Sequence, residues 1–169
     1  MRAEGEEMTP DILHKMFEYQ KGVLYRKTSN TNRVKAGSPV GSLHRTGYMM
    51  TKIAGKSWAV HRIIYMLHYG ELPGFIDHID GDRRNNHIEN LRPATIAENC
   101  RNCKLPRDNT SGIKGVSWHR SARKWQAAVR VDGKLHYLGV FSLKTMAEKA
   151  AKTFRQEYHG VFANHGKDA

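Results

Sequence analysis

The sequence has few cysteines, few acidic residues and no long apolar segment. Two cysteines in 169 residues cannot make a disulfide framework, so they favour a reducing compartment. No apolar run approaches the roughly 18 residues that a membrane-spanning helix needs, and no stretch has the anatomy of a signal peptide. These absences predict a cytoplasmic protein without a membrane partner.

Charge is the strongest bias that the composition does show. The chain has 28 Lys and Arg against 16 Asp and Glu, a formal net charge of +12 at pH 7. The cationic residues are spread along the chain, which is typical of a protein that binds a polyanion such as nucleic acid. A chain of this length holds one domain or two small ones.

Breakers and polar clusters divide the chain into a leader, two domains and a linker. We expect a disordered leader at 1–8, a first domain at 9–104, a linker at 105–111 and a second domain at 112–169. Thr9-Pro10 predicts a helix start. Apolar residues at helical spacing predict a helix at 61–69, which ends at Gly70. Strands are predicted at 22–25, 48–53 and 57–60.

The densest chemistry lies between residues 77 and 102. Asp77-His78 follows the apolar Phe75-Ile76, which predicts a strand that presents two functional side chains at its end. Residues 91–94 predict a return strand, and a capping box at Thr95 predicts a helix. A strand pair packed on that helix would bring Asn99 close to Asp77.

These residue types suit phosphodiester hydrolysis. A carboxylate and an amide oxygen are hard ligands for Mg²⁺ or Mn²⁺, which keep open positions for phosphate and water. A histidine beside the metal can take the proton of the attacking water.

The segment resembles the HNH motif in its phage and intron homing-endonuclease form, and the resemblance covers roughly residues 9–104. It implies a ββα-metal nuclease domain, with His78 as general base and Asp77 and Asn99 as metal ligands. Asn90 would brace the loop and help to orient His78. A phage origin, also implied by the resemblance, would place the protein in the host cell cytoplasm.

Several neighbouring side chains have two possible roles. Asp80 and Asp82 could join the metal, but an Asp-rich loop with Gly is more often a turn. His61 and Arg62 either contact the scissile phosphate or pack at a helix start, and His87 is expected to be exposed. Cys100 and Cys103 make half of a zinc site with no second cysteine pair, so we expect ordinary thiols and no structural zinc.

The second domain is predicted to be a three-stranded antiparallel sheet packed on one helix. Its strands fall at 114–119, 125–131 and 135–141, and Asp132-Gly133 predicts a hairpin turn. Strand alternation predicts one core face, made of Val116, Trp118, Trp125, Ala127, Val129 and Leu138. The helix stripe expected opposite it is Leu143, Met146, Ala147, Ala150, Ala151, Phe154 and Tyr158, with the aromatic pair in the core.

The other face of that sheet is polar and cationic, as a DNA-reading surface would be. The framework of GlyVal at 115–116, LysTrp at 124–125, AlaAla at 127–128 and LeuGly at 138–139 resembles the plant ethylene-response-factor (Apetala-type) DNA-binding domain. Ser117, His119, Leu135 and Tyr137 depart from that family's contacting residues, so its target sequence does not transfer. The candidate DNA contacts here are Ser117, His119, Arg120, Arg123, Lys124, Gln126, Arg130 and Tyr137.

Together these features predict a metal-dependent endonuclease acting on double-stranded DNA, expected to be a monomer, with a dimer left open. Two rivals remain: a DNA-binding regulator that has lost nuclease activity, and an RNA-binding protein of the same charge.

Overall fold

The chain divides into two compact units, Met1–Pro93 and Ala94–Ala169. The computed structural model describes residues 8–29 and 34–166. Residues 1–7 of the predicted leader lie outside that part, whereas Met8 packs against the core of the first unit. Within residues 8–29 and 34–166, no helix combines the length and the apolarity that crossing a membrane requires.

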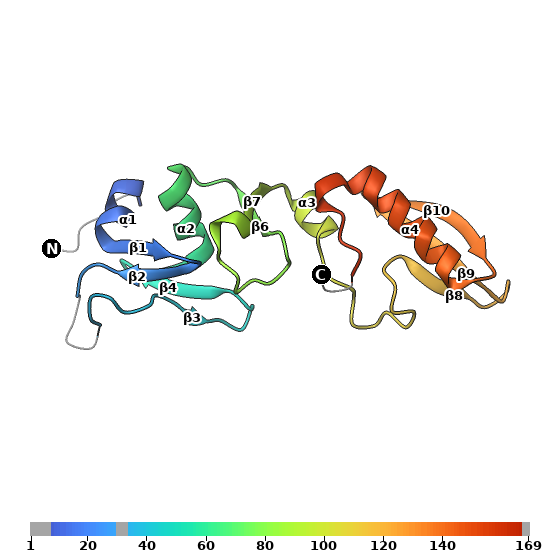
Figure 1. Cartoon of the computed structure of the whole chain (residues 1–169), viewed down its shortest axis with the longest axis horizontal. Helices are drawn as coiled ribbons and strands as arrows, with labels where there is room; N and C mark the ends of the chain where they lie inside the picture. The colour runs from blue at the N-terminus through green and yellow to red at the C-terminus, as the bar shows by residue number, and fades with distance from the viewer. Residues whose placement is uncertain (1–7, 30–33, 167–169) are drawn as a thin grey trace. The chain divides into compact units, whose positions relative to one another are not determined.

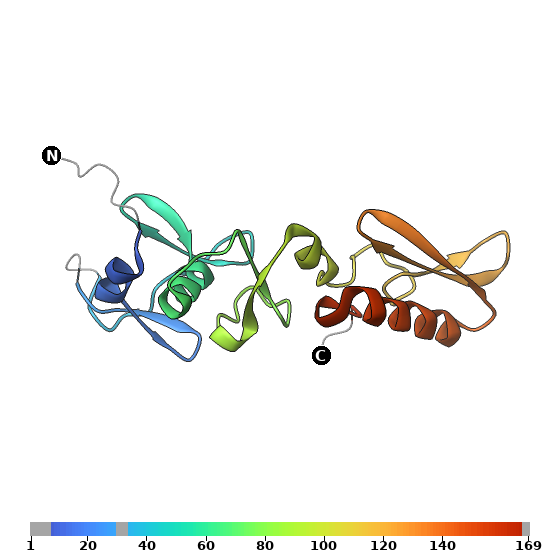
Figure 2. The same cartoon turned by 90° about the horizontal axis from the view of Figure 1, so that it is seen from above.

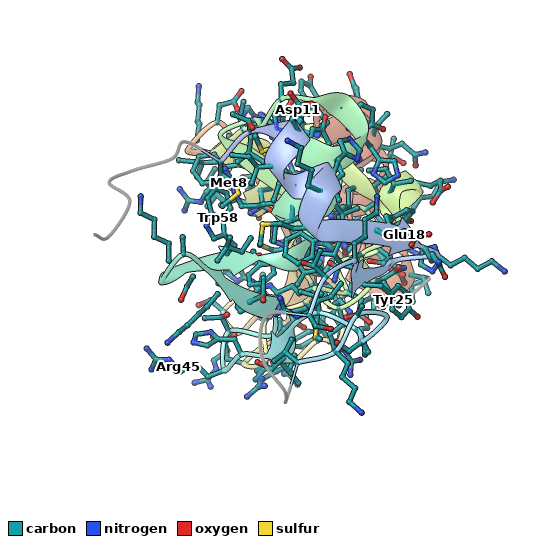
Figure 3. All side chains as sticks on the ribbon, turned by 90° about the vertical axis from the view of Figure 1, so that its left-hand side faces the viewer. Met8, Asp11, Glu18, Tyr25, Arg45 and Trp58 are labelled. Atoms are coloured by element: carbon teal, nitrogen blue, oxygen red, sulfur yellow. The ribbon has the colours of Figure 1, made fainter. Side chains whose placement is uncertain are left out.

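The first unit begins with a short helix and two small antiparallel sheets. Its first elements are α1 (Pro10–Met16), β1 (Phe17–Gln20), β2 (Val23–Arg26), β3 (Ser42–Leu43), β4 (Met49–Ile53) and β5 (Lys56–Ala59). Thr9 caps α1 as predicted, with its hydroxyl accepting from Ile12 N–H. Strands β1 and β2 form a hairpin in which Glu18 is opposite Tyr25, and Figure 3 shows these two side chains together at its edge.

Helix α2 (Val60–Tyr69) supplies five of the twelve buried residues in the core of this unit. Its apolar face recurs at helical spacing and buries Val60, Ile63, Ile64 and Leu67, and Gly70 ends it in the left-handed conformation that a glycine adopts easily. Figure 1 shows α1 and α2 on the same side of β1, β2 and β4. The core joins residues far apart in sequence, from Leu13 and Phe17 to Ile76 and Leu91.

The candidate catalytic segment follows α2. It consists of β6 (Phe75–His78), a 3₁₀ turn η1 (Ile88–Asn90) and β7 (Leu91–Ala94), with β6 hydrogen-bonded to β7. The predicted strand end and return strand are both present. Across them, Ile79 N–H donates to the Asn90 carbonyl at 2.9 Å, so the ladder continues into the loop.

The second unit is a three-stranded antiparallel sheet covered by one long helix. After α3 (Ile96–Arg101) come β8 (Val116–His119), β9 (Lys124–Val131), β10 (Lys134–Phe141) and α4 (Lys144–His159), then the 3₁₀ turn η2 (Gly160–Phe162). The sheet order is β10-β9-β8, and Figure 2 shows α4 running along it. Asp132 and Gly133 both have positive φ, which suits the predicted two-residue turn.

The face that α4 buries differs from the predicted stripe. Ala147, Ala151, Arg155 and His159 are buried, whereas Leu143, Met146 and Tyr158 are each about half exposed or more. The helix is therefore rotated toward its Arg155 side, and the expected core position of Tyr158 is wrong. Phe154 is partly buried against the sheet core, as predicted, and stacks on Tyr158 with ring centroids 4.3 Å apart.

The predicted burial of Trp118 is also wrong. Alternation assigns it to the face of Val116, but it is 47% exposed. It contacts Trp125 edge-on, at 5.1 Å between centroids.

The structure divides the chain after Pro93, before the segment predicted as a linker. Helix α3 belongs to the second unit because Arg101 pairs with Asp132 and Asn164 donates to the Asn102 carbonyl at 3.0 Å. The predicted linker also has its own order, since Ser111 is buried and donates to the Ile113 carbonyl at 2.9 Å.

Candidate active site

Asp77 and His78 stand at the carboxyl end of β6. Each is only 4% exposed, although polar side chains at a strand end are usually solvated. Burial of a carboxylate and an imidazole side by side requires partners for both. The structure supplies a different partner for each.

Asp77 is neutralised by Arg92 from the neighbouring strand β7. The Arg92 guanidinium donates to Oδ2 of Asp77 from Nε at 2.9 Å and from Nη2 at 2.7 Å. The Arg92 side chain is itself 15% exposed, so the pair is largely shielded from water. Charge-assisted bonds of this kind are stronger than neutral ones.

His78 is held by Asn86 from the loop that follows β6. Its Nε2 lies 3.1 Å from Oδ1 of Asn86, and an amide oxygen can only accept, so Nε2 carries the hydrogen and the basic lone pair is on Nδ1. Burial lowers the pKa of His78, against the opposing effects of the Asn86 bond and of the carboxylates of Asp80, Asp77 and Asp82. The imidazole is thus kept neutral and able to accept a proton.

A second imidazole packs against the first. The rings of His61 and His78 lie 5.0 Å apart edge-on, and Tyr48 contacts both, at 5.1 and 5.9 Å. His61 comes from the first turn of α2 and its buried Nδ1 has no hydrogen-bond partner among the described residues. Burial, then the nearby His78 and Arg62, lowers the pKa of His61 to about 3.

The loop between β6 and β7 is organised by Asn90. Its side chain donates to Oδ1 of Asp80 at 3.0 Å and to the Asn85 carbonyl at 2.8 Å, and its Oδ1 accepts from Asp80 N–H at 3.0 Å. Burial alone would raise the pKa of Asp80, but hydrogen bonds from Asp82, Asn85 and Asn90 outweigh it and the pKa is lowered. Asp80 therefore acts as an acceptor inside the turn.

The β1–β2 hairpin supports this loop from the opposite end of the sequence. The Tyr19 hydroxyl accepts from Ile88 N–H at 3.0 Å. Gly22, with φ of +82°, lies so close to His87 that a Cβ there would be 2.7 Å from the His87 ring. Close approach at this point requires glycine.

The predicted site residues have separate outcomes. Asp77, His78 and His61 come together in the first unit, whereas Arg62 donates to the Gly74 carbonyl at 3.1 Å. Asn99 lies on α3 of the second unit, where the predicted capping box is present, and its approach to Asp77 stays a prediction. Asn90 bonds to Asp80 and Asn85 within the loop, and the side chain that bonds to His78 is Asn86. The role of Asn90 in orienting His78 stays a prediction, and His87 is exposed as expected.

Sequence reasoning missed Arg92, Asn86 and Tyr48. Arg92 lies in the return strand, two residues after Asn90. The predicted pairing of that strand with the strand of Asp77 could have indicated that the two side chains are close. Nothing in the sequence distinguishes Asn86 from Asn85, because both are polar loop residues of one type.

The donor chemistry of Asp77 fits a catalytic divalent cation with few protein ligands. Mg²⁺ is commonly held by one or two carboxylates together with water and phosphate. Among the described residues, no three His, Cys, Asp or Glu side chains gather as a metal site. A cation at Asp77 would compete with Arg92 for Oδ2.

Cys100 and Cys103 are both exposed and unbridged, and the Cys103 thiol donates to the Asn99 carbonyl at 3.7 Å. The expectation of no structural zinc stays a prediction.

The outer face of the second unit's sheet carries the candidate DNA contacts. Ser117 is opposite Gln126, and the Gln126 amide donates to its hydroxyl at 2.8 Å. Tyr137 and Leu135 extend the face, at 60% and 57% exposed. Exposed cations at the β8–β9 turn, Arg120, Arg123 and Lys124, border it.

The comparisons with known proteins cover the segment that contains the first of these sites. The HNH endonuclease model matches residues 59–101, from the end of β5 to the end of α3. Protein 3.8 of Escherichia phage T7 is 42% identical over 91 residues, which cover 53% of this chain and 73% of that protein. A mimivirus protein named Uncharacterized HNH endonuclease L560 (Acanthamoeba polyphaga mimivirus) is 30% identical over 128 residues, 74% of this chain and 65% of that protein.

A third relative is YosQ of Bacillus subtilis (strain 168), whose name describes it as derived from the SPbeta prophage and groups it with HNH homing endonucleases. It is 32% identical over 82 residues, 47% of each chain. No solved structure matches the chain. Residues 59–101 therefore match an HNH endonuclease domain, and the chain is similar to proteins named as HNH endonucleases.

Proposed function

We propose that the protein is a metal-dependent endonuclease of the homing type that hydrolyses phosphodiester bonds in double-stranded DNA. The observation that carries this proposal is the buried Asp77-His78 pair, with His78 neutral and its basic nitrogen fixed by Asn86. The match of residues 59–101 to the HNH endonuclease model and the similarity to relatives named as HNH endonucleases support it. In this proposal β6, β7 and α3 form a ββα-metal arrangement.

His78 acts as the general base. Its Nδ1 takes a proton from the water that attacks phosphorus, and a base of this kind typically contributes about 10²–10⁴-fold. Because the pKa of His78 is lowered by burial, the base is in its neutral form at neutral pH. Asn86 is a positioning residue that keeps the hydrogen on Nε2.

Asp77 and Asn99 would hold Mg²⁺ or Mn²⁺. When bound, the cation supplies charge neutralisation for the pentavalent transition state and for the departing oxygen. Arg92 pairs with Asp77 and orients it in a buried setting, and Asn90 fixes the loop that carries Asn86. His61 and Arg62 lie at the start of α2, beside this centre, and complete the surface for the scissile strand.

The second unit binds the duplex in this proposal. Its outer sheet face, as in ethylene-response-factor domains, would enter the major groove, with Gln126 and Arg130 directed to base edges and the cations of the β8–β9 turn to phosphates. One active centre per chain predicts nicking by a monomer, and cutting of both strands only where two chains cooperate.

Supercoiled plasmid provides the test, incubated with Mg²⁺ or Mn²⁺ and with EDTA as the metal-free reference. We expect the wild type to produce nicked circles, His78→Ala to lose at least 10²-fold in rate, and His87→Ala, an exposed histidine of the same loop, to retain the wild-type rate. An intact plasmid under both metals, with duplex still bound, would favour a DNA-binding regulator. Tighter binding of folded RNA than of duplex DNA would favour an RNA-binding protein.

A further inference from the structure

Arg83, in the loop between β6 and β7, connects the candidate active site to the turn between β3 and β4. Its Nη1 donates to the Thr46 carbonyl at 2.8 Å, and its guanidinium carbon lies over the Tyr48 ring, 4.8 Å from the centroid. The stem of the side chain passes Gly47, where a Cβ would lie 3.5 Å from Arg83 Cδ. An exposed arginine is therefore held in place by a hydrogen bond and an aromatic ring.

The β3–β4 turn that receives Arg83 is itself hydrogen-bonded. His44 N–H donates to the Tyr48 carbonyl at 2.9 Å, and Gly47 N–H donates to the His44 carbonyl at 2.8 Å. Nδ1 of His44 lies 2.9 Å from the Thr46 hydroxyl oxygen. Gly47 has φ of +84°, a left-handed conformation that glycine adopts without steric cost. The carbonyl and the ring that hold Arg83 are thus in place before any substrate binds.

Tyr48 contacts Arg83 and also both imidazoles of the candidate active site. Its ring centroid lies 5.1 Å from that of His61 and 5.9 Å from that of His78. One aromatic ring therefore contacts both the proposed general base and the guanidinium. Phosphates repeat along a DNA strand at about one per 3.4 Å of helix axis. A strand whose scissile phosphate lies at His78 would bring a neighbouring phosphate within reach of Arg83.

The charge and the donors of Arg83 suit such a phosphate. Arginine has five N–H donors in a fixed fork, and the bond to Thr46 uses Nη1, so Nε and Nη2 take no part in it. Asp82, the carboxylate next to Arg83 in the sequence, is bonded by Arg84 at both oxygens, at 3.3 and 3.5 Å. A guanidinium can bind phosphate through two parallel bonds, and one that is already held loses less entropy when it does so.

We propose that Arg83 binds a phosphate of the cleaved strand next to the scissile one, and so fixes the register of that strand at His78. This role rests on the proposed function, since it takes His78 as the base that activates the attacking water. A purely structural Arg83 would hold the loop to the β3–β4 turn without touching DNA. The two roles differ in whether the charge of the side chain contributes to duplex binding.

Duplex binding by the full chain in EDTA tests the phosphate contact in the absence of cleavage. Fluorescence anisotropy of a labelled duplex at several salt concentrations gives the slope of log affinity against log salt, which is about 0.9 for each phosphate neutralised. We expect Arg83→Gln to reduce the magnitude of this slope by about 1 and the affinity by about tenfold. Arg83→Lys keeps the charge and should keep the slope.

Arg84→Gln is the matched control, because it removes the same charge from the next position of the loop. The Arg84 side chain is 66% exposed and pairs with Asp82, so we expect its variant to keep the wild-type slope. Equal decreases in Arg83→Gln and Arg84→Gln would show that the loop attracts DNA by its total charge, and would overturn a site at Arg83. An unchanged slope in Arg83→Gln would overturn it too, and a lower melting temperature would then indicate that the residue only holds the loop.

A neutral phosphate analogue locates the contact on the strand. Cleavage by the wild type with Mg²⁺ or Mn²⁺ maps a nick, and a methylphosphonate then replaces one phosphate at a time on either side of it. We expect one position to weaken binding of the wild type and to have no further effect in Arg83→Gln, as an interacting pair requires. Additive losses at every position would overturn the proposal.

The nuclease function and the phosphate contact can fail separately. A plasmid that stays intact under both metals, with a slope change specific to Arg83, would contradict the nuclease function and confirm a phosphate site at this residue. Cleavage by the wild type, with an unchanged slope in Arg83→Gln, would support the nuclease function and exclude the contact.

Discussion

Arg92, on strand β7, donates two hydrogen bonds to one oxygen of Asp77, Oδ2, at the end of strand β6. The proposed metal ligand is thus held by a cation of the protein. Both the stability of the first unit and the proposed metal binding by Asp77 therefore depend on this ion pair.

Removing the Arg92 guanidinium while keeping Asp77 should destabilise the protein. We expect Arg92→Met to lower the free energy of unfolding by about 3–5 kcal/mol, because it leaves the buried carboxylate without its counter-charge. Urea denaturation measures this loss, and the double variant Asp77→Asn/Arg92→Met should recover a large part of it. A decrease in the free energy of unfolding below about 1 kcal/mol is typical of solvent-exposed ion pairs, and would contradict the burial of this one.

Asn86 should control the titration of His78. Its hydrogen bond raises the pKa of His78 against the effect of burial, so Asn86→Ala should lower that pKa further and reduce kcat more than it changes KM. The His78 ring proton, followed by nuclear magnetic resonance against pH, gives the direct readout. Asn85→Ala alters the same loop without touching His78, and equal shifts in the two variants would argue against a specific role for Asn86.

Acid should destabilise the first unit through His61. The pKa of His61 is lowered from 6.5 to about 3, so between these values the unfolded chain binds a proton that the folded chain does not. Stability therefore falls as pH falls through this window, by up to about 1.4 kcal/mol per pH unit. Denaturation curves at pH 7 and pH 5 measure the slope. The slope should decrease in His61→Gln and persist in His87→Gln, and a wild type equally stable at both pH values would contradict the burial of a neutral His61.

Two glycines of the second unit provide a matched pair. Gly112 and Gly115 have φ of +70° and +76°, but a Cβ at Gly112 would meet nothing within 4 Å, whereas one at Gly115 would lie 2.8 Å from the Ala128 carbonyl oxygen. Gly112→Ala should cost about 1–2 kcal/mol from backbone strain alone, and Gly115→Ala clearly more. Thermal unfolding measures the loss of stability in each variant. Equal losses would show that the β8–β9 backbone moves to make room for the added Cβ.

Duplex binding should depend on the outer sheet face. Lys124→Ala should weaken binding of all sequences and reduce the slope of log affinity against log salt by about 1, whereas Gln126→Ala should relax sequence preference. Fluorescence anisotropy at several salt concentrations separates these effects. Lys149→Ala on α4 is the charge control; a slope change as large as that of Lys124→Ala would exclude a localised sheet contact.

Local signals in the sequence predicted local structure well. The cap at Thr9, the box at Thr95 and the Asp132-Gly133 turn depend on a few adjacent residues, and all are present. Alternation also assigned the strand residues of the second unit to the correct faces. Alternation does not show how deeply each residue of a face is buried, and Trp118, expected in the core, is 47% exposed.

Side-chain pairs between residues that are distant in the sequence could not be predicted from these local signals. The pairing of Asp77 with Arg92 and of His78 with Asn86 depends on strand register and loop course, which one sequence does not specify. The burial of Arg155 in place of Tyr158 has the same origin. An apolar stripe predicts the aromatic residue inside, but the helix rotates so that small alanines approach the sheet.

The bond from Ile88 N–H to the Tyr19 hydroxyl spans 69 positions of sequence, and Leu13, Phe17 and Leu24 share one core with Ile76 and Leu91. A recombinant fragment limited to residues 59–101 would therefore contain the motif but lack the scaffold that fixes its loop. A shortened form of this protein should retain the sequence from α1 onward.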